Sequence, residues 1–255
     1  MKYKIFYTLY VGSKKLYGGS DEYISILEKV KRNGLELKLA SIELKNDPDI
    51  VLAAVEQNGL ALQFASKELK NDYDIVLAAV SYNGFPLEYA SDELKNDITI
   101  VSIAVINNGL ALQYASGELK KNSVVVETAV KQNGLALQFA SREIVLAAVT
   151  NNGLALQHAS EDLKEDREIV LAAVTDNGLA LQFVFEPFKE DRDIVLAAVT
   201  NIGLALKHAS ETLKSDFEVV ETAVTQNGLA LKHASETLKN NEEIIKIANR
   251  YNTIA

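Results

Sequence analysis

Three histidines are the residues of this chain whose type and spacing most readily suggest chemistry. His158, His208 and His233 each stand five residues after a glycine, where matched segments carry leucine, phenylalanine or tyrosine. A histidine metal site needs imidazole nitrogens within about 2 Å of one ion, whereas packed helices lie about 8–10 Å apart. We therefore interpret the histidines as members of an aromatic row between helices. A pH-sensitive or partner-contacting stripe is the alternative.

Serines and paired acids could also do chemistry, but both recur at regular intervals. Eight serines follow an alanine at matched positions, and no histidine–acid pair is tied to any of them, so a serine nucleophile is not expected. Acid pairs such as Asp47/Asp49 and Asp72/Asp74 could attract calcium. They also stand where a helix would begin, and acids at that place are stabilised as helix caps. Because the chain has no cysteine, thiolate chemistry is excluded. We expect no enzyme, no cofactor and no metal.

A tandem repeat is the element that must position these residues. Nine glycines mark one position, at intervals of 25 residues with a single interval of 19. They are Gly34, Gly59, Gly84, Gly109, Gly134, Gly153, Gly178, Gly203 and Gly228. In each unit, we expect a first helix to run from the capping acid to a left-handed C-cap at Asn-Gly. We expect a second helix of about ten residues, with Leu87, Ala90, Ser91 and Leu94 on one apolar face.

Such short helices are marginal alone, so stacking must hold them. The sequence predicts an all-α fold, an α-solenoid of about nine 25-residue two-helix repeats. Apolar and polar side chains alternate in the N-terminal stretch. This pattern predicts a small β-hairpin cap over residues 1–19. Residues 20–141 and 142–255 form the first and second solenoid halves, joined by a repeat that is shortened by six residues.

Two irregularities interrupt the array. The shortened repeat lacks a turn, so we expect residues 135–152 to run as one continuous helix. A local repair with a shortened second helix is the alternative. In the following unit, Pro187 replaces a residue of the second helix. We expect the helix to stop or bend there, because proline removes a hydrogen bond and clashes with the preceding turn.

The repeat unit resembles a known family. The pattern Asp-x-x-Ile-Val-Leu-Ala-Ala-Val-x-x-Asn-Gly-x-Ala-Leu-x-x-Ala-Ser-x-x-Leu-Lys, present with few changes at 47–70, 72–95 and 191–214, is similar to the domain of unknown function 4116 tandem repeat. That resemblance covers almost the whole chain. It implies tandem-repeat segments of proteins from intracellular bacteria, protists and large viruses, with no shared reaction or ligand. It supports the fold and leaves the function open.

The distribution of charge limits the classes of partner that we expect. Residues 1–34 hold seven Lys/Arg and three Asp/Glu, and the remainder holds 19 against 32, within a net charge of −9. An acidic body disfavours nucleic acid. No apolar run approaches the roughly 18 residues that span a bilayer, so we expect no membrane segment. The N-terminal stretch lacks the features of a cleaved signal peptide. We expect a cytoplasmic protein, with delivery to a host cell without a cleaved signal peptide as a second expectation.

Positions that vary between units are the candidates for binding. One row lies on the first helix, where Ser102, Glu127, Glu221 and Lys246 replace a leucine, which argues for exposure. A leucine half-buried against a neighbouring repeat is the alternative. The candidate partner-binding residues are Leu52, Leu77, Leu146, Leu171, Leu196, Phe64, Tyr89, Tyr114, Phe139, His158, Phe183, His208 and His233. The main hypothesis is a non-catalytic scaffold that binds a protein or peptide. The alternatives are a nucleic-acid-related role, by binding or acidic DNA mimicry, and a scaffold segment of a larger effector-like protein.

Overall fold

The computed structural model describes residues 21–251. The chain divides into two units, Met1–Asn133 and Gly134–Ala255. The expected all-helical architecture of repeated units is confirmed, because residues 21–251 contain α-helices and 3₁₀ helices and no strand. The β-hairpin expected over residues 1–19 lies outside the described residues.

A complete repeat contains a long α-helix, a 3₁₀ helix and a short helical turn, and the shortened repeat lacks the turn. The long α-helices are α2 (Asp21–Arg32), α4 (Pro48–Gln57), α5 (Tyr73–Val80), α6 (Ile98–Asn107) and α7 (Ser123–Gln132) in the first unit, and α8 (Arg142–Asn151), α10 (Arg167–Asp176), α12 (Arg192–Asn201), α13 (Phe217–Gln226) and α15 (Glu242–Tyr251) in the second. The 3₁₀ helices are η1 (Gly34–Leu39), η2 (Gly59–Phe64), η4 (Phe85–Tyr89), η6 (Gly109–Tyr114), η8 (Gly134–Phe139), η9 (Gly153–His158), η10 (Gly178–Phe183), η11 (Gly203–His208) and η13 (Gly228–His233). The short turns are α3 (Ile42–Lys45), η3 (Leu69–Asn71), η5 (Leu94–Asn96), η7 (Leu119–Lys121), α9 (Glu161–Lys164), α11 (Glu186–Lys189), η12 (Leu213–Ser215) and α14 (Glu236–Lys239).

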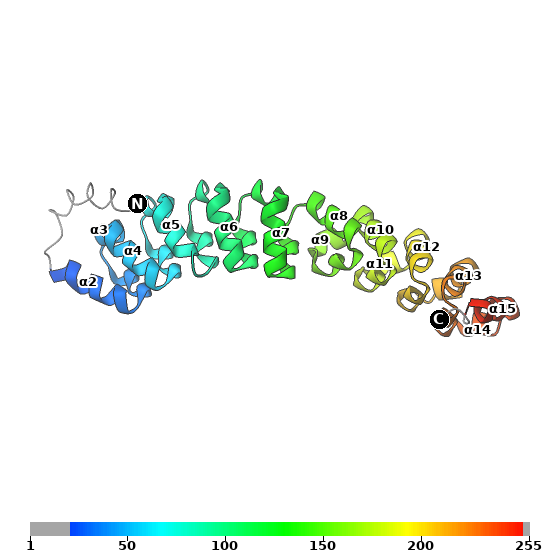
Figure 1. Cartoon of the computed structure of the whole chain (residues 1–255). Helices are drawn as coiled ribbons and strands as arrows, with labels where there is room; N and C mark the ends of the chain where they lie inside the picture. The colour runs from blue at the N-terminus through cyan, green and yellow to red at the C-terminus, as the bar shows by residue number, and fades with distance from the viewer. Residues whose placement is uncertain (1–20, 252–255) are drawn as a thin grey trace. The chain divides into compact units, whose positions relative to one another are not determined.

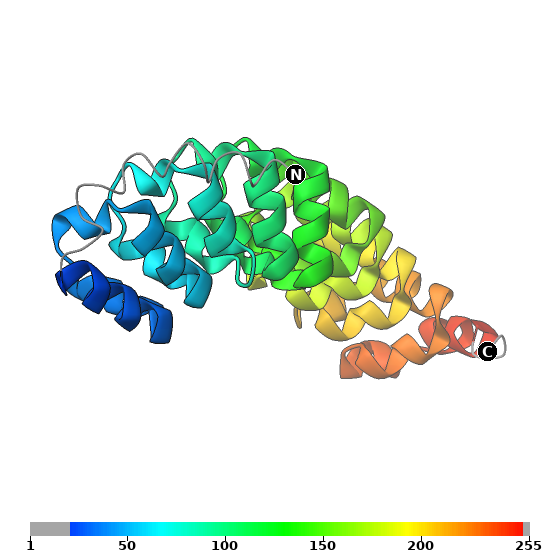
Figure 2. The same cartoon turned by 60° about the vertical axis from the view of Figure 1, so that its left-hand side comes forward.

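Within each unit, the α-helices stand side by side in chain order (Figure 1 and Figure 2). Consecutive 3₁₀ helices pack against one another and against the α-helices. The core lies between these elements. Ile50, Val51, Ala54 and Val55 of α4 are at most 1% exposed, which is why the same four positions keep Ile, Val or Ala in other long helices. Each buried aliphatic side chain contributes roughly 1.5–3 kcal/mol.

The expected start of the long helix is confirmed. The Asp47 carboxylate accepts a hydrogen bond from the Ile50 N–H at 3.0 Å, and Pro48 occupies the first turn, where its missing N–H is harmless. The helix ends when the Asn58 N–H donates to the Ala54 carbonyl at 2.9 Å. The Asn58 side chain then accepts from the Leu60 N–H at 3.0 Å, so one asparagine ends the α-helix and caps the 3₁₀ helix that follows.

The marker glycine has a different role from the one predicted. No residue in 21–251 has a positive φ, so the expected left-handed C-cap at Asn-Gly is wrong. The glycine is required instead by a close approach to the next repeat. A Cβ atom added to Gly59 would lie 2.2 Å from the carbonyl oxygen of Ala79, and one added to Gly153 would lie 2.1 Å from that of Ala173. A side chain at this position would push neighbouring repeats apart.

The second helix is not the single ten-residue α-helix that we predicted. The 3₁₀ helix η4 ends at Tyr89, and Ala90 adopts an extended backbone with φ −65° and ψ 159°. The physical reason is the serine that follows. The Ser91 N–H donates to the carbonyl of Lys70 in the preceding repeat at 2.9 Å, and its hydroxyl accepts from the Leu94 N–H at 3.2 Å. Serine therefore ends one element and caps the next.

The prediction of one continuous helix over residues 135–152 is also wrong. The 3₁₀ helix η8 ends at Phe139, and α8 begins at Arg142. Between them Ser141 is extended, with φ −70° and ψ 161°, as the matched serines are. Ser141 leads directly into the long helix, and its carbonyl accepts from the Val145 N–H at 3.0 Å. The six absent residues therefore remove the short turn and leave the Ala-Ser break in place.

Pro187 does not interrupt a helix. The 3₁₀ helix η10 ends at Phe183, and Val184 is extended with φ −90° and ψ 157°. Pro187 then lies in the first turn of α11, where proline needs no hydrogen-bond partner. A stop near Pro187 is present, as expected, but the proline does not cause it, because the break lies before Pro187, at the place where other repeats also break.

Candidate functional site

The row five residues after the marker glycine lies on the 3₁₀ helices. Every predicted member is half-buried: Phe64, Tyr89 and Tyr114 in the first unit, and Phe139, His158, Phe183, His208 and His233 in the second. Because neighbouring 3₁₀ helices pack against each other within a unit, the structure brings successive members of this row together. We call these residues the 3₁₀ row.

Aromatic contacts in the first unit link successive repeats. The rings of Phe85 and Tyr114 meet edge to face, with centroids 6.4 Å apart and an angle of 79°. Burial raises the pKa of Tyr89 and of Tyr114, and the nearby carboxylate of Glu88 raises both further. Both phenols are therefore neutral at pH 7 and can act as hydrogen-bond donors at the rim of this row.

The histidines lie in less polar surroundings than exposed imidazoles do. Burial, together with the smaller effects of Lys207, Lys189, His233 and Lys214, lowers the pKa of His208 to about 4. Burial also lowers the pKa of His233. Both rings are therefore neutral at pH 7. In residues 21–251, no group of three or more His, Asp or Glu side chains is placed to hold a metal ion.

The second predicted row lies on the long α-helices. Leu52, Leu77, Leu146, Leu171 and Leu196 are all half-buried. We call these residues the leucine row. Leu146 also lines an open groove on α8 with Glu143, Ala147, Thr150 and Asn151. The structure thus forms two rows, one carried by the α-helices and one by the 3₁₀ helices.

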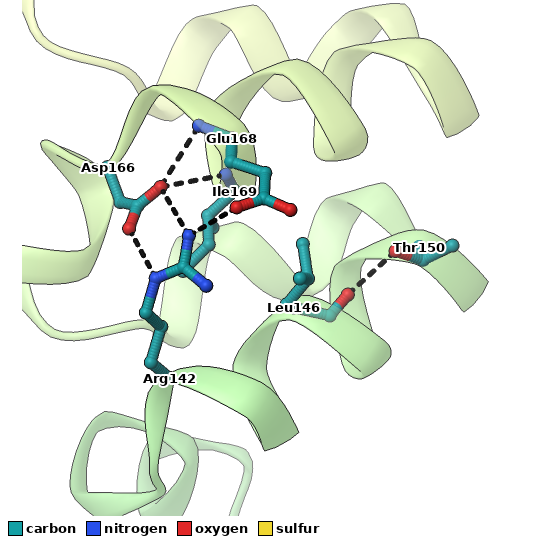
Figure 3. Close-up of polar contacts among 6 residues, drawn as sticks. All are labelled: Arg142, Leu146, Thr150, Asp166, Glu168 and Ile169. Atoms are coloured by element: carbon teal, nitrogen blue, oxygen red, sulfur yellow. Dashed lines mark hydrogen bonds and ion pairs between the residues drawn. The ribbon is translucent and has the colours of Figure 1, made fainter.

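The acid pairs cap helices, as predicted, and those of the second unit also bind arginines. Asp166 accepts backbone hydrogen bonds from Glu168 at 3.0 Å and from Ile169 at 3.3 Å. The Arg142 guanidinium reaches the same carboxylate at 2.7 Å and the Glu168 carboxylate at 2.6 Å (Figure 3). Arg142 holds the pKa of Asp166 below its ordinary value.

The same contact recurs at the next two repeats. Arg167 binds Asp191 at 3.0 Å and Asp193 at 3.1 Å, and Arg192 binds Asp216 at 3.4 Å and also contacts Glu218. We call these three contacts the arginine ladder. Its arginine side chains are 41–50% exposed, so each pair contributes little to stability. The ladder ties the start of each helix to the start of the next.

Two sets of contacts between repeats were missed by sequence reasoning. The arginines of the ladder stand 25 residues apart at the first position of the long helix, so their spacing could have revealed them. The marker glycine N–H donates to a side-chain oxygen of the next repeat, as from Gly109 to Gln132 at 2.6 Å and from Gly153 to Asp176 at 2.7 Å. The residue that accepts this bond differs between repeats, so the sequence does not show it as a recurring pattern.

No helix within residues 21–251 combines the length and the apolar character needed to cross a bilayer.

Comparison with known proteins identifies the repeat. The family model described as "Domain of unknown function (DUF4116)" matches residues 26–70, 72–120, 97–143, 141–189, 191–237 and 216–255. This confirms the resemblance that the repeat pattern predicts. No curated protein and no solved structure matches the chain.

Proposed function

The chain belongs to the family of the Domain of unknown function (DUF4116), and from this and the geometry of its repeats we propose that it is a non-catalytic α-solenoid scaffold that binds a protein or peptide along its variable surface. The observation that carries the proposal is the contrast between constant and variable positions. Buried positions keep Ile, Val, Ala or Leu in unit after unit, whereas half-exposed positions of the two rows change residue type.

This contrast favours binding, because the stability of the fold does not require the residue type at the two rows to differ between repeats. A half-buried side chain on an ordered helix is held in place by its neighbours, yet part of its surface still faces solvent. Such positions can present different shapes at each repeat without disturbing the core. Aromatic and leucine side chains at these places supply the apolar area that protein interfaces use.

The experiment uses substitutions that the array already tolerates. Leu171→Glu with Leu196→Glu places in the leucine row the residue that Glu221 provides at the matched position of α13. The control, Thr212→Glu with Thr237→Glu, adds the same charge at exposed positions, where earlier repeats carry Glu68 and other acids. Both double variants should melt within a few degrees of the parent, because these changes leave the core intact.

The readout is affinity capture from cells, quantified for the parent and both double variants. A partner of the leucine row should be captured by the parent and by the threonine control and lost from the leucine variant. Equal capture by all three proteins, or no specific capture by any of them, would refute binding through this row.

A further inference from the structure

The last two 3₁₀ helices of the second unit carry lysines without acidic partners. Lys207 on η11 and Lys232 on η13 occupy the position four residues after the marker glycine, and both are exposed. Most other repeats have an uncharged or acidic side chain there: Gln63, Glu88, Gln113, Gln138, Gln157 and Gln182. Among residues 21–251, no ion pair joins either lysine to a carboxylate. Because η11 and η13 pack against each other, these two free cations lie on adjacent elements.

Cationic groups surround the imidazole that follows Lys207. His208 is approached by Lys207 from its own helix, Lys189 from α11, Lys214 from η12 and His233 from η13. The Nε2 atom of His208 is buried and has no hydrogen-bond partner in the described part of the chain. Each of these elements presents a basic group to this ring, although Lys189 and Lys214 are each paired with a glutamate.

The neighbouring lysines are already neutralised, which separates them from the two free ones. Lysines at the ends of the short turns bind a glutamate three residues earlier, at 2.7–2.8 Å. These pairs are Lys189–Glu186, Lys214–Glu211 and Lys239–Glu236. Lys207 and Lys232 therefore remain as the cations available to an external anion.

Apolar area lies beside the free cations. Side chains three residues apart on a 3₁₀ helix lie on the same side. Leu229, which is 54% exposed, therefore stands on the side of η13 that carries Lys232. An anion that also brings apolar side chains fits this combination better than a phosphate backbone does. A long nucleic acid would in addition meet a chain with 35 acidic and 26 basic side chains.

We propose that the face formed by Lys207, His208, Lys232 and His233 binds an acidic peptide segment, whose carboxylates pair with the two lysines. This proposal rests on the scaffold function and names the chemistry of its partner at the last two 3₁₀ helices. Peptide carboxylates near His208 and His233 favour their protonated forms and raise their pKa values. Because the pKa of His208 in the free protein is about 4, this coupling contributes little to binding at pH 7, where the two lysines supply the charge.

The test uses the full chain and a fluorescein-labelled peptide of eight glutamates, measured by fluorescence anisotropy in 50 mM NaCl at pH 7. Lys207→Gln with Lys232→Gln installs the residue present in other repeats and should weaken binding by about tenfold. Lys38→Gln removes an exposed lysine from the matched position of η1 and should change the Kd by less than about twofold.

A second readout follows the histidines by NMR titration, with and without the peptide. The pKa of His208 should rise on binding in the parent and stay unchanged in the double variant. The proposal is overturned if the glutamate peptide does not bind, or if Lys38→Gln weakens it as strongly. It is also overturned if an eight-nucleotide single-stranded DNA binds more tightly and through the same two lysines. None of these results would affect the capture of a partner through the leucine row. The scaffold function is therefore tested separately from the peptide site.

Discussion

Replacing a marker glycine with alanine should destabilise the protein at one repeat and leave it nearly unchanged at a neighbouring repeat of the same unit. In Gly153→Ala, the new Cβ atom would lie 2.1 Å from the Ala173 carbonyl oxygen and 3.0 Å from the Asn177 N atom. In Gly134→Ala, the nearest atom is Nε2 of the His158 ring, at 3.2 Å. Gly134 belongs to the repeat that is six residues shorter than the others.

The magnitudes follow from these distances. An ordinary carbon–oxygen contact is about 3.3 Å, so η9 must move roughly 1 Å from α10 in Gly153→Ala. A gap of that size forfeits a quarter to a half of the dispersion energy at the contacts it opens, and overpacking of this kind typically costs about 1–3 kcal/mol. Alanine also stabilises the protein by roughly 0.4–1 kcal/mol, because it restricts the conformations of the unfolded chain. The net expectation is that Gly153→Ala loses about 1–2 kcal/mol and that Gly134→Ala stays within about 0.5 kcal/mol of the parent.

Urea unfolding followed by circular dichroism at 222 nm measures both variants under the same conditions. Because both glycines belong to the second unit, the same transition reports both changes. Equal losses of unfolding free energy, or a larger loss for Gly134→Ala, would show that close approach to the next helix is not the reason for the glycine.

Three further predictions test other contacts. Ala79→Asp should lower the melting temperature far more than Lys67→Asp, because Ala79 is 1% exposed and Lys67 lies on the surface; equal shifts would show that the assignment of buried faces is wrong. Ser91→Ala should cost about 1 kcal/mol in urea unfolding, whereas Ser141→Ala should be close to neutral, because only the first hydroxyl caps a turn and the second has no partner in the described chain. Arg142→Gln should produce a small but measurable reduction in the stability difference between pH 7 and pH 2.5, because the side chain of Arg142 is 41% exposed. The lowered pKa of its capping carboxylate stabilises the fold above the unfolded-state pKa, and this contribution is lost as the pH falls through the folded-state pKa; an unchanged pH profile would argue against the ion pair.

The sequence allowed prediction of those features that depend on local chemistry or on the period. Asp47 and its equivalents mark helix starts because an N-cap carboxylate bonds to its own first turn. The repeat and its family follow from the regular glycines. Both rows of half-buried residues were predicted as sets, and the structure places each set on one kind of element.

Features that depend on the neighbouring repeat were mispredicted or missed. Ala90 and Ser91 suit a helix locally, and only the bond from Ser91 to Lys70 in the preceding repeat explains the break. Glycine after asparagine fits a left-handed cap equally well, yet Gly59 is fixed by the carbonyl of Ala79, 20 residues further along. The free lysines on η11 and η13 became visible as a pair only after the glutamate partners of nearby lysines were placed.

The bonds between repeats have a consequence for synthesis on the ribosome. Those bonds span short stretches of chain, for example 20 residues from Ser66 to Asn46, 23 from Gly109 to Gln132 and 26 from Asn201 to Thr175. A nascent repeat can therefore complete its contacts once about one further repeat has emerged from the exit tunnel. Structure within each unit can thus grow from the N-terminal side during elongation, without waiting for distant segments to be made. At the growing end, the apolar face that still awaits a neighbour is that of the newest repeat.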